Sequence, residues 1–599
     1  MSDYKAPLRD IQFALEHIVG LPELAQIDEF AHSDPEMVAG ILEENGRFMA
    51  DLVAPLNAVG DQAGSVRNDD GSITTPPGFA AAYQRYVEAG WGGVPFAEAH
   101  GGGGFPWLVG VAMQEIMCSA NMAFSLCPLL TQGAIDALLH HGSEEQQEVY
   151  LRRMINGEWS GTMNLTEPDA GSDVGALRAR AVPADDGSYR ITGTKIFITY
   201  GDHDMAENII HLVLARTPDA PPGTKGISLF IVPKFILDAD NKPGERNDVE
   251  VVSIEHKLGI HGSPTCVLSF GEKDDGAVGY LIGEENAGMR YMFTMMNNAR
   301  LSVGLQGLAL SERAYQDALE YAQERRQGRA LGAPKGESSA IIDHADVRRM
   351  LMTQRAYIEA MRALCYLNAA AIDLSRVHPE EAERASSDEL AELLTPLSKG
   401  WCSDIGNEMT SLAVQVHGGM GYVEETGVAQ HFRDVRIAAI YEGTNGIQAA
   451  DLVGRKLPMR GGGVVTDHIA RRRALDSELA EHAELTSIRD GLTIAVDQFE
   501  AATRWVMDHG VEDPRNALAG SSPYLRLTGQ VTAGWLMARQ ALAATGLLAD
   551  NPDDEFLRAK VVTARFFVEQ LLPQVSGLVP AITAGYEDLF SLSPSALAG

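Results

Sequence analysis

The chain has 599 residues, 45% of them hydrophobic and 22% charged, which is typical of a globular protein with more than one domain. Acidic residues number 82 against 48 basic ones, so the formal net charge is −34. Nucleic acid and anionic membranes bind basic patches, and a surface this negative therefore excludes a nucleic-acid partner. A polyanionic small ligand would need cations placed locally at its site.

The five cysteines lie far apart in the sequence and form neither a CxxC pair nor a cluster with histidine. This usage predicts no disulfide framework and no metal site, and it fits a reducing, cytoplasmic localisation. The first residues carry charge where a signal peptide would be apolar. No run of about 18 uninterrupted apolar residues occurs, so we expect no membrane insertion.

Residues 1–160 are predicted to form an N-terminal helical domain that begins with a short extension, 1–35. Apolar residues recur at helical spacing in Ile11–Val19 and again in Pro35–Val59.

The pattern changes near residue 161, where short β-branched and aromatic segments alternate with clusters of proline and glycine. Several short strands at this spacing predict a small β domain over 161–280. The expected strands are Tyr189–Thr199, Ile209–Leu214, Ile227–Val232, Val249–Ile254 and Thr265–Phe270.

Long helices are predicted from there to the end of the chain. A helix over Met289–Arg326 opens a helical bundle at 281–460, and a glycine-rich break separates this bundle from an additional helical domain at 461–599. The predicted fold class is therefore mainly α, with a small central β domain and a C-terminal helical extension.

Two short segments could carry chemistry. MNLTEPDAGSD, residues 163–173, places amides and hydroxyls at a turn, where they could bind a pyrophosphate or a flavin edge. A plain strand-to-turn connection is the alternative. In IYEGTNGIQ, residues 440–448, Glu442 follows an apolar run, which would raise its pKa and suit a general base. The alternative is a glutamate in the first turn of a helix, favoured by the helix dipole.

Arginines in the predicted helix could supply the local cations. Arg300 lies between Met296 and Leu301 inside an apolar helix, where a charged side chain requires an anionic partner. Arg325 is expected to end the helix, and a favourable interaction with the helix dipole is its simpler explanation.

Taken in order, seven segments over roughly 35–460 resemble the acyl-CoA dehydrogenase family. These are TEPDAGSD (166–173), KIFITYG (195–201), KLGIHGSPT (257–265), NNAR (297–300), ERRQG (324–328), QVHGGMGY (415–422) and YEGTNGIQ (441–448). The opening residues and the long C-terminal extension resemble a bacterial branch of that family, which includes 3-methylmercaptopropionyl-CoA dehydrogenase.

The resemblance implies a function and a set of site residues. Glu442 would be the catalytic base that removes the α-proton of an acyl-CoA thioester while a hydride leaves the β-carbon for the flavin of FAD. The residues implied to bind FAD are Met163, Leu165, Thr166, Gly171, Ser172, Phe197, Thr199, Arg325, Gln415, Gly418, Gly419, Thr444, Asn445 and Gly446. Those implied to bind substrate are Ser172, Asn297, Arg300, Tyr441 and Gly443.

Within this set, Arg325 and the segment from Gln415 to Gly419 would contact the FAD of a neighbouring subunit. Ala299 replaces a threonine of some family members, which removes one hydrogen bond to CoA, and Met163 replaces an aromatic residue.

The resemblance also implies partners and leaves two alternatives. An electron-transferring flavoprotein would accept the electrons, and the extension would favour a homodimer. Substrates could be 3-methylmercaptopropionyl-CoA or a short, medium or long fatty acyl-CoA. One alternative is an acyl-CoA oxidase, in which the flavin reacts with oxygen. The other is a DNA-associated flavoprotein of the same fold, which would need a basic C-terminal surface that this acidic chain does not offer.

Overall fold

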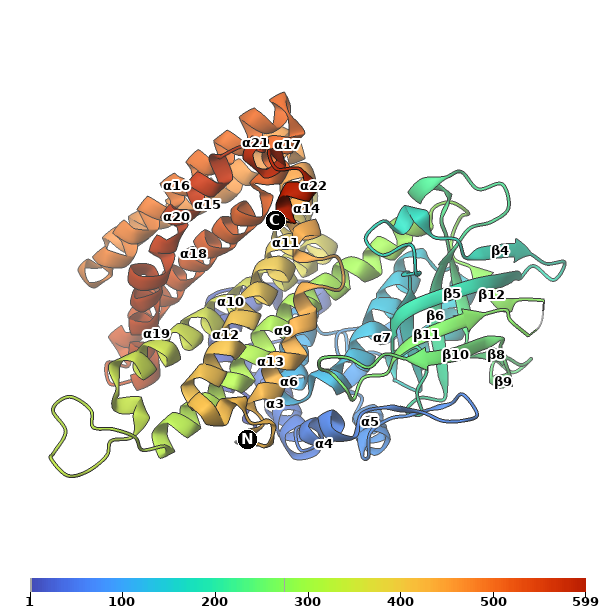
Figure 1. The fold of residues 1–599 in the computed structure, drawn as a ribbon, viewed down its shortest axis with the longest axis horizontal. Helices are drawn as coiled ribbons and strands as arrows, with labels where there is room; N and C mark the ends of the chain where they lie inside the picture. Colours follow the sequence, from blue (N-terminus) through green and yellow to red (C-terminus); the bar gives the residue numbers. More distant parts are fainter. Residues whose placement is uncertain (1–2, 274, 599) are drawn as a thin grey trace. The chain divides into compact units, whose positions relative to one another are not determined.

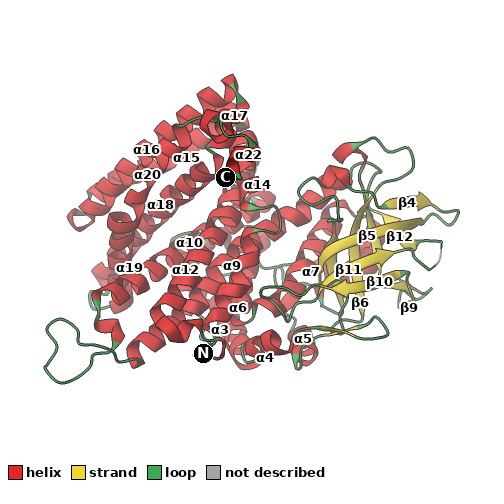
Figure 2. Ribbon diagram, viewed as in Figure 1, coloured by secondary structure: helices red, strands yellow, loops and turns green. Residues whose placement is uncertain are grey.

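The computed structural model describes residues 3–273 and 275–598, and it is mainly helical with a single region of strands (Figures 1 and 2). The described chain divides into two compact units. Unit 1 contains the residues up to Glu43, Pro106–Glu115, and the residues from Val303 onward. Unit 2 contains Glu44–Phe105 and Ile116–Ser302.

The helices before the β region are α1 (Leu8–His17), α2 (Leu21–Leu24), α3 (Pro35–Phe48), α4 (Leu56–Ala63), α5 (Phe79–Glu88), α6 (Trp107–Ala120), α7 (Met122–His141) and α8 (Glu144–Ile155). A short hairpin pairs β1 (Val66–Arg67) with β2 (Ile73–Thr74). Side chains fix two of the helix starts: Asn121 caps α7, and Ser143 and Gln146 form a capping box at α8. These caps fix the residues at which α7 and α8 begin.

The strands of unit 2 form one large sheet and one small hairpin. Their bounds are β3 (Trp159–Asn164), β4 (Arg180–Pro183), β5 (Tyr189–Thr199), β6 (Asn208–Ala215), β7 (Ser228–Pro233), β8 (Phe235–Leu237), β9 (Pro243–Arg246), β10 (Val249–Ile254), β11 (Thr265–Phe270) and β12 (Ala277–Leu281). The large sheet has the order β10-β11-β5-β12-β7-β6-β3, with β4 paired to β5, while β8 and β9 form the hairpin.

The best-buried part of the large sheet is the end formed by β7, β6 and β3, which are buried along their whole length. β3 runs parallel to β6, and α7 packs against β3. By length and composition α7 could cross a membrane, the only such helix among the described residues, but 94% of its most apolar window is buried inside the protein. It is therefore placed as a core helix that supports β3.

The helices after the strands are α9 (Gly288–Glu324), α10 (Ala345–Val377), α11 (Glu381–Pro396), α12 (Cys402–His417), α13 (Val428–Val435) and α14 (Asn445–Asp451). The C-terminal extension holds α15 (Gly463–Ala480), α16 (Thr486–Glu512), α17 (Pro514–Ala519), α18 (Ser521–Asp550), α19 (Glu555–Phe566), α20 (Val575–Thr583), α21 (Glu587–Phe590) and α22 (Pro594–Leu597). Within unit 1, α18 and α19 pack on α10, and α18 also packs on α14.

The N-terminal extension also packs on the C-terminal one. Lys560 of α19 is buried, and its Nζ lies 2.6 Å from Asp10 of α1 and 3.3 Å from Glu359 of α10. Phe13 of α1 meets Phe556 of α19 edge-on, with 5.8 Å between ring centroids. Helices α1 and α19, from the two extensions, therefore both pack against α10.

The predicted fold class is confirmed: helices, a central β region, a helical bundle and an additional C-terminal set of helices follow in that order. One expectation was wrong in detail. The helix α9 ends at Glu324, so Arg325 does not end it but begins the connection to α10.

Candidate functional site

In unit 2 the structure brings the two predicted flavin-binding segments side by side. The Ile196 N–H donates to the Thr166 carbonyl at 2.9 Å, and the Thr162 hydroxyl donates to the Thr199 carbonyl at 2.7 Å. The turn after β3 therefore lies along the end of β5, which places Leu165 and Thr166 close to Phe197 and Thr199. Gly171 and Ser172 are exposed on the same turn, and a Cβ on Gly171 would meet nothing within 4 Å.

A buried ion pair holds this turn. The Glu167 carboxylate accepts hydrogen bonds from the backbone N–H groups of Arg178 and Ala179, at 2.6 and 3.0 Å. Lys195 of β5, which is fully buried, donates its Nζ to Glu167 at 2.8 Å and to the Leu165 carbonyl at 3.0 Å. Burial lowers the pKa of Lys195 to about 8, against the opposing effect of Glu167. The pair fixes the backbone on which Leu165 and Thr166 lie.

A β-bulge presents the Phe197 ring to solvent. Between Lys195 and Ile198, β5 has one residue more than the facing part of β11, and Phe197 has a φ of 59°. Such a bulge turns a side chain out of its alternating position. Phe197 is 58% exposed, whereas its neighbour Ile198 is buried. An exposed aromatic face next to the Leu165–Thr166 edge suits the flat ring system of a flavin.

Asn297 and Arg300 lie in the unit 2 part of α9. The Arg300 Nη1 donates to the Asn297 side-chain oxygen at 3.2 Å, and the guanidinium lies 5.7 Å from the centre of the Phe293 ring. Arg300 is 6% exposed. The two predicted CoA-binding side chains are thus neighbours on one helix face, and Arg300 is preorganised by Asn297.

In unit 1, Glu442 lies on a strained turn that directly precedes α14. Glu442 has a φ of 57° and Gly443 a φ of 78°, so both occupy the left-handed region. For glutamate this conformation is unfavourable, and such strain concentrates at functional sites. The helix begins only at Asn445, with Thr444 as its N-cap, so Glu442 is not a first-turn helix residue. The turn is tied to α9 on its other side, where the Tyr441 hydroxyl donates to Gln306.

The Asn445 side chain points into the protein. Its oxygen accepts from Lys399 Nζ at 2.8 Å, and its nitrogen donates to the Gly400 carbonyl at 3.1 Å and to Asp404 at 2.6 Å. Burial raises the pKa of Asp404, which the hydrogen bond from Asn445 partly offsets. With its amide engaged in this way, Asn445 would contact a cofactor through its backbone.

The remaining predicted residues lie elsewhere. Gln415, Gly418 and Gly419 stand at the far end of α12, roughly 18 Å along the helix from the Ser403 contact with Asn445, at about 1.5 Å per residue. Arg325 is exposed just after α9. Their contact with the FAD of a neighbouring subunit stays a prediction.

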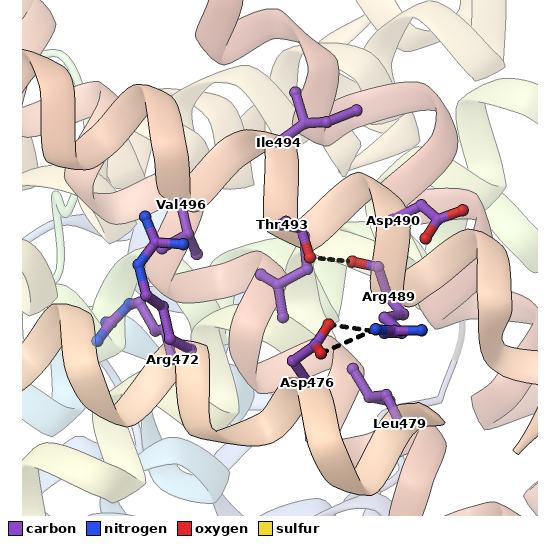
Figure 3. A pocket seen from close by; sticks show the side chains of 10 residues that line it. Arg472, Asp476, Leu479, Arg489, Asp490, Thr493, Ile494 and Val496 are labelled. Atoms are coloured by element: carbon purple, nitrogen blue, oxygen red, sulfur yellow. Dashed lines mark hydrogen bonds and ion pairs between the residues drawn. The ribbon is translucent and has the colours of Figure 1, made fainter. Parts of the chain in front are cut away.

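A pocket of about 720 Å³ lies between α15 and α16 of the C-terminal extension (Figure 3). It contains none of the predicted site residues. Two of its arginines are engaged by carboxylates: Arg489 pairs with Asp476, at 2.6 Å, and Arg473 with Asp497, at 2.7 Å. No group of three metal-binding side chains occurs among the described residues either. Asp490 also lines the pocket, which therefore holds acidic and basic side chains but none of the residues predicted to carry the chemistry.

Sequence reasoning missed the two lysines that hold these turns. Lys195 was part of a recognised motif but had no assigned role, although its place on the inward face of an alternating strand was a usable signal. Lys399 gave no comparable signal, because its burial depends on helices that follow far later in the chain.

Unit 2 thus offers an exposed aromatic edge that suits a flavin and an arginine suited to an anion, and unit 1 offers a carboxylate on a strained turn. Each is a feature that a flavin-dependent dehydrogenase of acyl thioesters would require. Comparisons with known proteins agree with this class.

The chain belongs to the acyl-CoA dehydrogenase family. It matches the N-terminal domain of that family over residues 35–158, the middle domain over 162–272 and the C-terminal domain over 286–457. Residues 465–593 match a further family, described as acetyl-CoA dehydrogenase C-terminal like. The protein is thus an oxidoreductase that acts on acyl-CoA, with FAD as its cofactor.

Several relatives extend over nearly the whole chain. A 3-methylmercaptopropionyl-CoA dehydrogenase of Ruegeria pomeroyi is 47% identical over 98% of this chain and 100% of its own. A broad-specificity linear acyl-CoA dehydrogenase of Mycobacterium tuberculosis is 36% identical over 100% of both.

Solved structures share the fold. Butyryl-CoA dehydrogenase from Megasphaera elsdenii superposes with a TM-score of 0.56 and 27% identity, covering 70% of this chain and 97% of its own. ACDH-11 of Caenorhabditis elegans, solved with C11-CoA, covers 99% of this chain and 96% of its own, with a TM-score of 0.78 and 19% identity. The fold of the extension is therefore shared with some relatives and not with others.

Proposed function

We propose that the protein dehydrogenates a short acyl-CoA thioester between its α and β carbons, with Glu442 as the base and 3-methylmercaptopropionyl-CoA as a preferred substrate. The observation that carries the catalytic assignment is the left-handed backbone of Glu442, directly before the anchored start of α14. The 47% identity to the Ruegeria pomeroyi enzyme supports the substrate.

Each group of residues has its own role in the proposed reaction. Glu442 takes the α-proton, and its backbone N–H donates to the thioester oxygen, where negative charge develops as the α C–H bond breaks. Arg300 and Asn297 bind the anionic CoA portion, and Leu165, Thr166, Phe197 and Thr199 hold the cofactor. FAD supplies the acceptor for the hydride that leaves the β-carbon as the double bond forms. An electron-transferring flavoprotein would be the electron acceptor.

A panel of acyl-CoAs assayed with an artificial electron acceptor tests the substrate. We expect the highest kcat/KM for 3-methylmercaptopropionyl-CoA and butyryl-CoA, and lower values as the acyl chain lengthens. A preference for palmitoyl-CoA would overturn the proposal. Reoxidation of the substrate-reduced flavin in air separates a dehydrogenase from an oxidase: slow reoxidation is expected, and fast reoxidation with formation of hydrogen peroxide would favour the oxidase.

Arg300→Ala should weaken binding of acyl-CoA and leave the FAD content unchanged. A charge-assisted hydrogen bond contributes on the order of 1.5–3 kcal/mol, so the KM should rise about 10- to 100-fold. Arg290→Ala is the matched control, because Arg290 is an exposed arginine on the same helix. An unchanged KM in the Arg300 variant would mean that Arg300 has a structural role only.

The protein is proposed to be a cytoplasmic homodimer. All five cysteines are buried and free, which fits a reducing compartment. The C-terminal helices cover α10 of their own chain: the Tyr357 ring meets the Phe567 ring edge-on at 5.5 Å. A helix face covered within the chain does not need a further subunit. Light scattering should give twice the chain mass of 64.5 kDa, and four times that mass would contradict the dimer.

A further inference from the structure

The turn that carries Glu442 is held by a residue outside every predicted site. Lys399 lies in the π-helical turn η8 (Leu397–Trp401), between α11 and α12, and is fully buried. A buried ammonium group is unfavourable unless polar partners surround it. Its Nζ donates to the Asn445 side-chain oxygen at 2.8 Å. Lys399 therefore acts on the first residue of α14, three positions after Glu442.

The rest of the turn is anchored through the same helix. The Thr444 hydroxyl caps α14 by accepting from the Ile447 N–H at 3.2 Å. The Gln448 side chain, fully buried, lies 3.4 Å from the Glu442 carbonyl. Because strained backbone persists only where the surrounding structure over-determines it, the position of α14 decides whether Glu442 keeps its left-handed conformation.

The C-terminal extension holds the Lys399 turn in place. Gly529 of α18 faces Trp401 so closely that a Cβ would lie 2.3 Å from the Trp401 side chain. A Cβ on Gly400 would lie 2.7 Å from the Leu525 side chain and 3.4 Å from that of Gln448. The π-helical turn is thus packed tightly between α14 and α18.

We propose that Lys399 is a positioning residue for the catalytic base, acting through Asn445, and that helix α18 of the C-terminal extension locks the turn that carries it. This inference rests on the proposed role of Glu442. If α18 holds this turn, the C-terminal extension helps to support the active site.

Lys399→Met tests the proposal, because methionine fills a similar volume without the N–H donors. The matched control is Ser398→Ala, because Ser398 is buried in the same turn but its hydroxyl accepts a hydrogen bond from the Asn368 side chain of α10, at 3.0 Å. Both holoenzymes are assayed with butyryl-CoA and an artificial acceptor. Turnover is expressed per bound FAD, and the isotope effect of α-deuterated substrate is measured as well.

In Lys399→Met, kcat per bound FAD should fall about 10- to 100-fold, since a displacement of about 1 Å at a reacting group can cost on the order of 100-fold. The KM and FAD content should stay close to wild type, and the α-deuterium isotope effect should rise because proton removal becomes more rate-limiting. Ser398→Ala should keep wild-type kcat. If Lys399→Met does not fold, Ser403→Ala removes one hydroxyl partner of Asn445 and should lower kcat per FAD several-fold.

The inference is overturned if kcat per FAD is unchanged in Lys399→Met. If only Ser403→Ala folds, an unchanged kcat per FAD in that variant overturns it. Equal losses in Lys399→Met and Ser398→Ala also overturn it, since the turn would then matter only for stability. Loss of FAD with normal turnover of the remaining holoenzyme would place Lys399 with the cofactor instead. The proposed function is tested separately by Glu442→Gln. Full activity of that variant would refute Glu442 as the base. An inactive Glu442→Gln together with a fully active Lys399→Met would refute only the positioning role of Lys399.

Discussion

Glu442→Gln is expected to lower kcat by at least about 10²–10⁴-fold, the usual effect of removing a general base. Glutamine matches glutamate in size but cannot accept the α-proton. FAD content and the binding of acyl-CoA should remain near wild type, because the backbone N–H of residue 442 and the CoA-binding residues are unchanged. Turnover is measured with an artificial electron acceptor, and binding by the spectral change of the flavin on addition of substrate.

Two further variants sharpen this result. Glu442→Asp retains a carboxylate that is one methylene shorter, and it should have activity between wild type and the glutamine variant. Glu481→Gln neutralises an exposed glutamate of the C-terminal extension and should behave as wild type. Wild-type turnover of Glu442→Gln would contradict the assignment of Glu442 as the base.

Arg362→Met is expected to destabilise unit 1 by about 3–5 kcal/mol, because removing one partner of a buried ion pair leaves an uncompensated charge. Arg362 of α10 bonds Glu115 of α6 at 2.6 Å and Glu312 of α9 at 2.9 Å. The Tyr366 hydroxyl donates to Glu115 at 2.6 Å, and all these groups are buried. The loss should appear as a lower apparent Tm in calorimetry.

The stability of Arg362→Met, relative to wild type, should decrease as the pH rises. Burial already raises the pKa of Glu115 above its ordinary value of 4.5, against the opposing effect of Arg362. Without the arginine, the folded state holds this carboxyl protonated to a higher pH than the unfolded chain does. Stability is therefore lost as the pH rises through the folded pKa, and the difference from wild type should be larger at pH 8 than at pH 5.

Arg349→Met is the control on the same helix, because the pair of Arg349 with Asp346 is exposed and surface pairs contribute little. Its apparent Tm should match that of wild type at both pH values. A destabilisation of Arg362→Met that was no greater than that of this control would contradict a structural role for the buried cluster.

Much of the local structure follows from the sequence pattern alone. The strands expected at Tyr189–Thr199, Val249–Ile254 and Thr265–Phe270 have those bounds in the structure. Alternation of apolar and polar residues is a short-range property that can be observed within the segment itself. Helix α9 was likewise predicted within two residues at each end, because a long apolar period without proline permits few other structures.

The candidate site could be predicted only in part from the sequence pattern. The motif around Glu442 was recognisable from its residues, but the left-handed backbone of Glu442 was not, because glutamate has no preference for that conformation. Asn445 was expected to contact FAD, and the motif gave no sign that its amide is engaged by Lys399 and Asp404. That contact depends on a turn that lies more than forty residues earlier in the chain.

The sequence by itself determined the order of the helices and strands, the family and the residues that could carry the chemistry, because each depends on neighbours in the chain. Only the tertiary structure decided which charges are buried and what holds the reactive turn. Glu115 and Arg362 meet from α6 and α10, and Trp401 packs on Gly529 of a helix in the C-terminal extension. Such contacts arise when distant segments exclude water from a shared core, and no local pattern encodes which segments will meet.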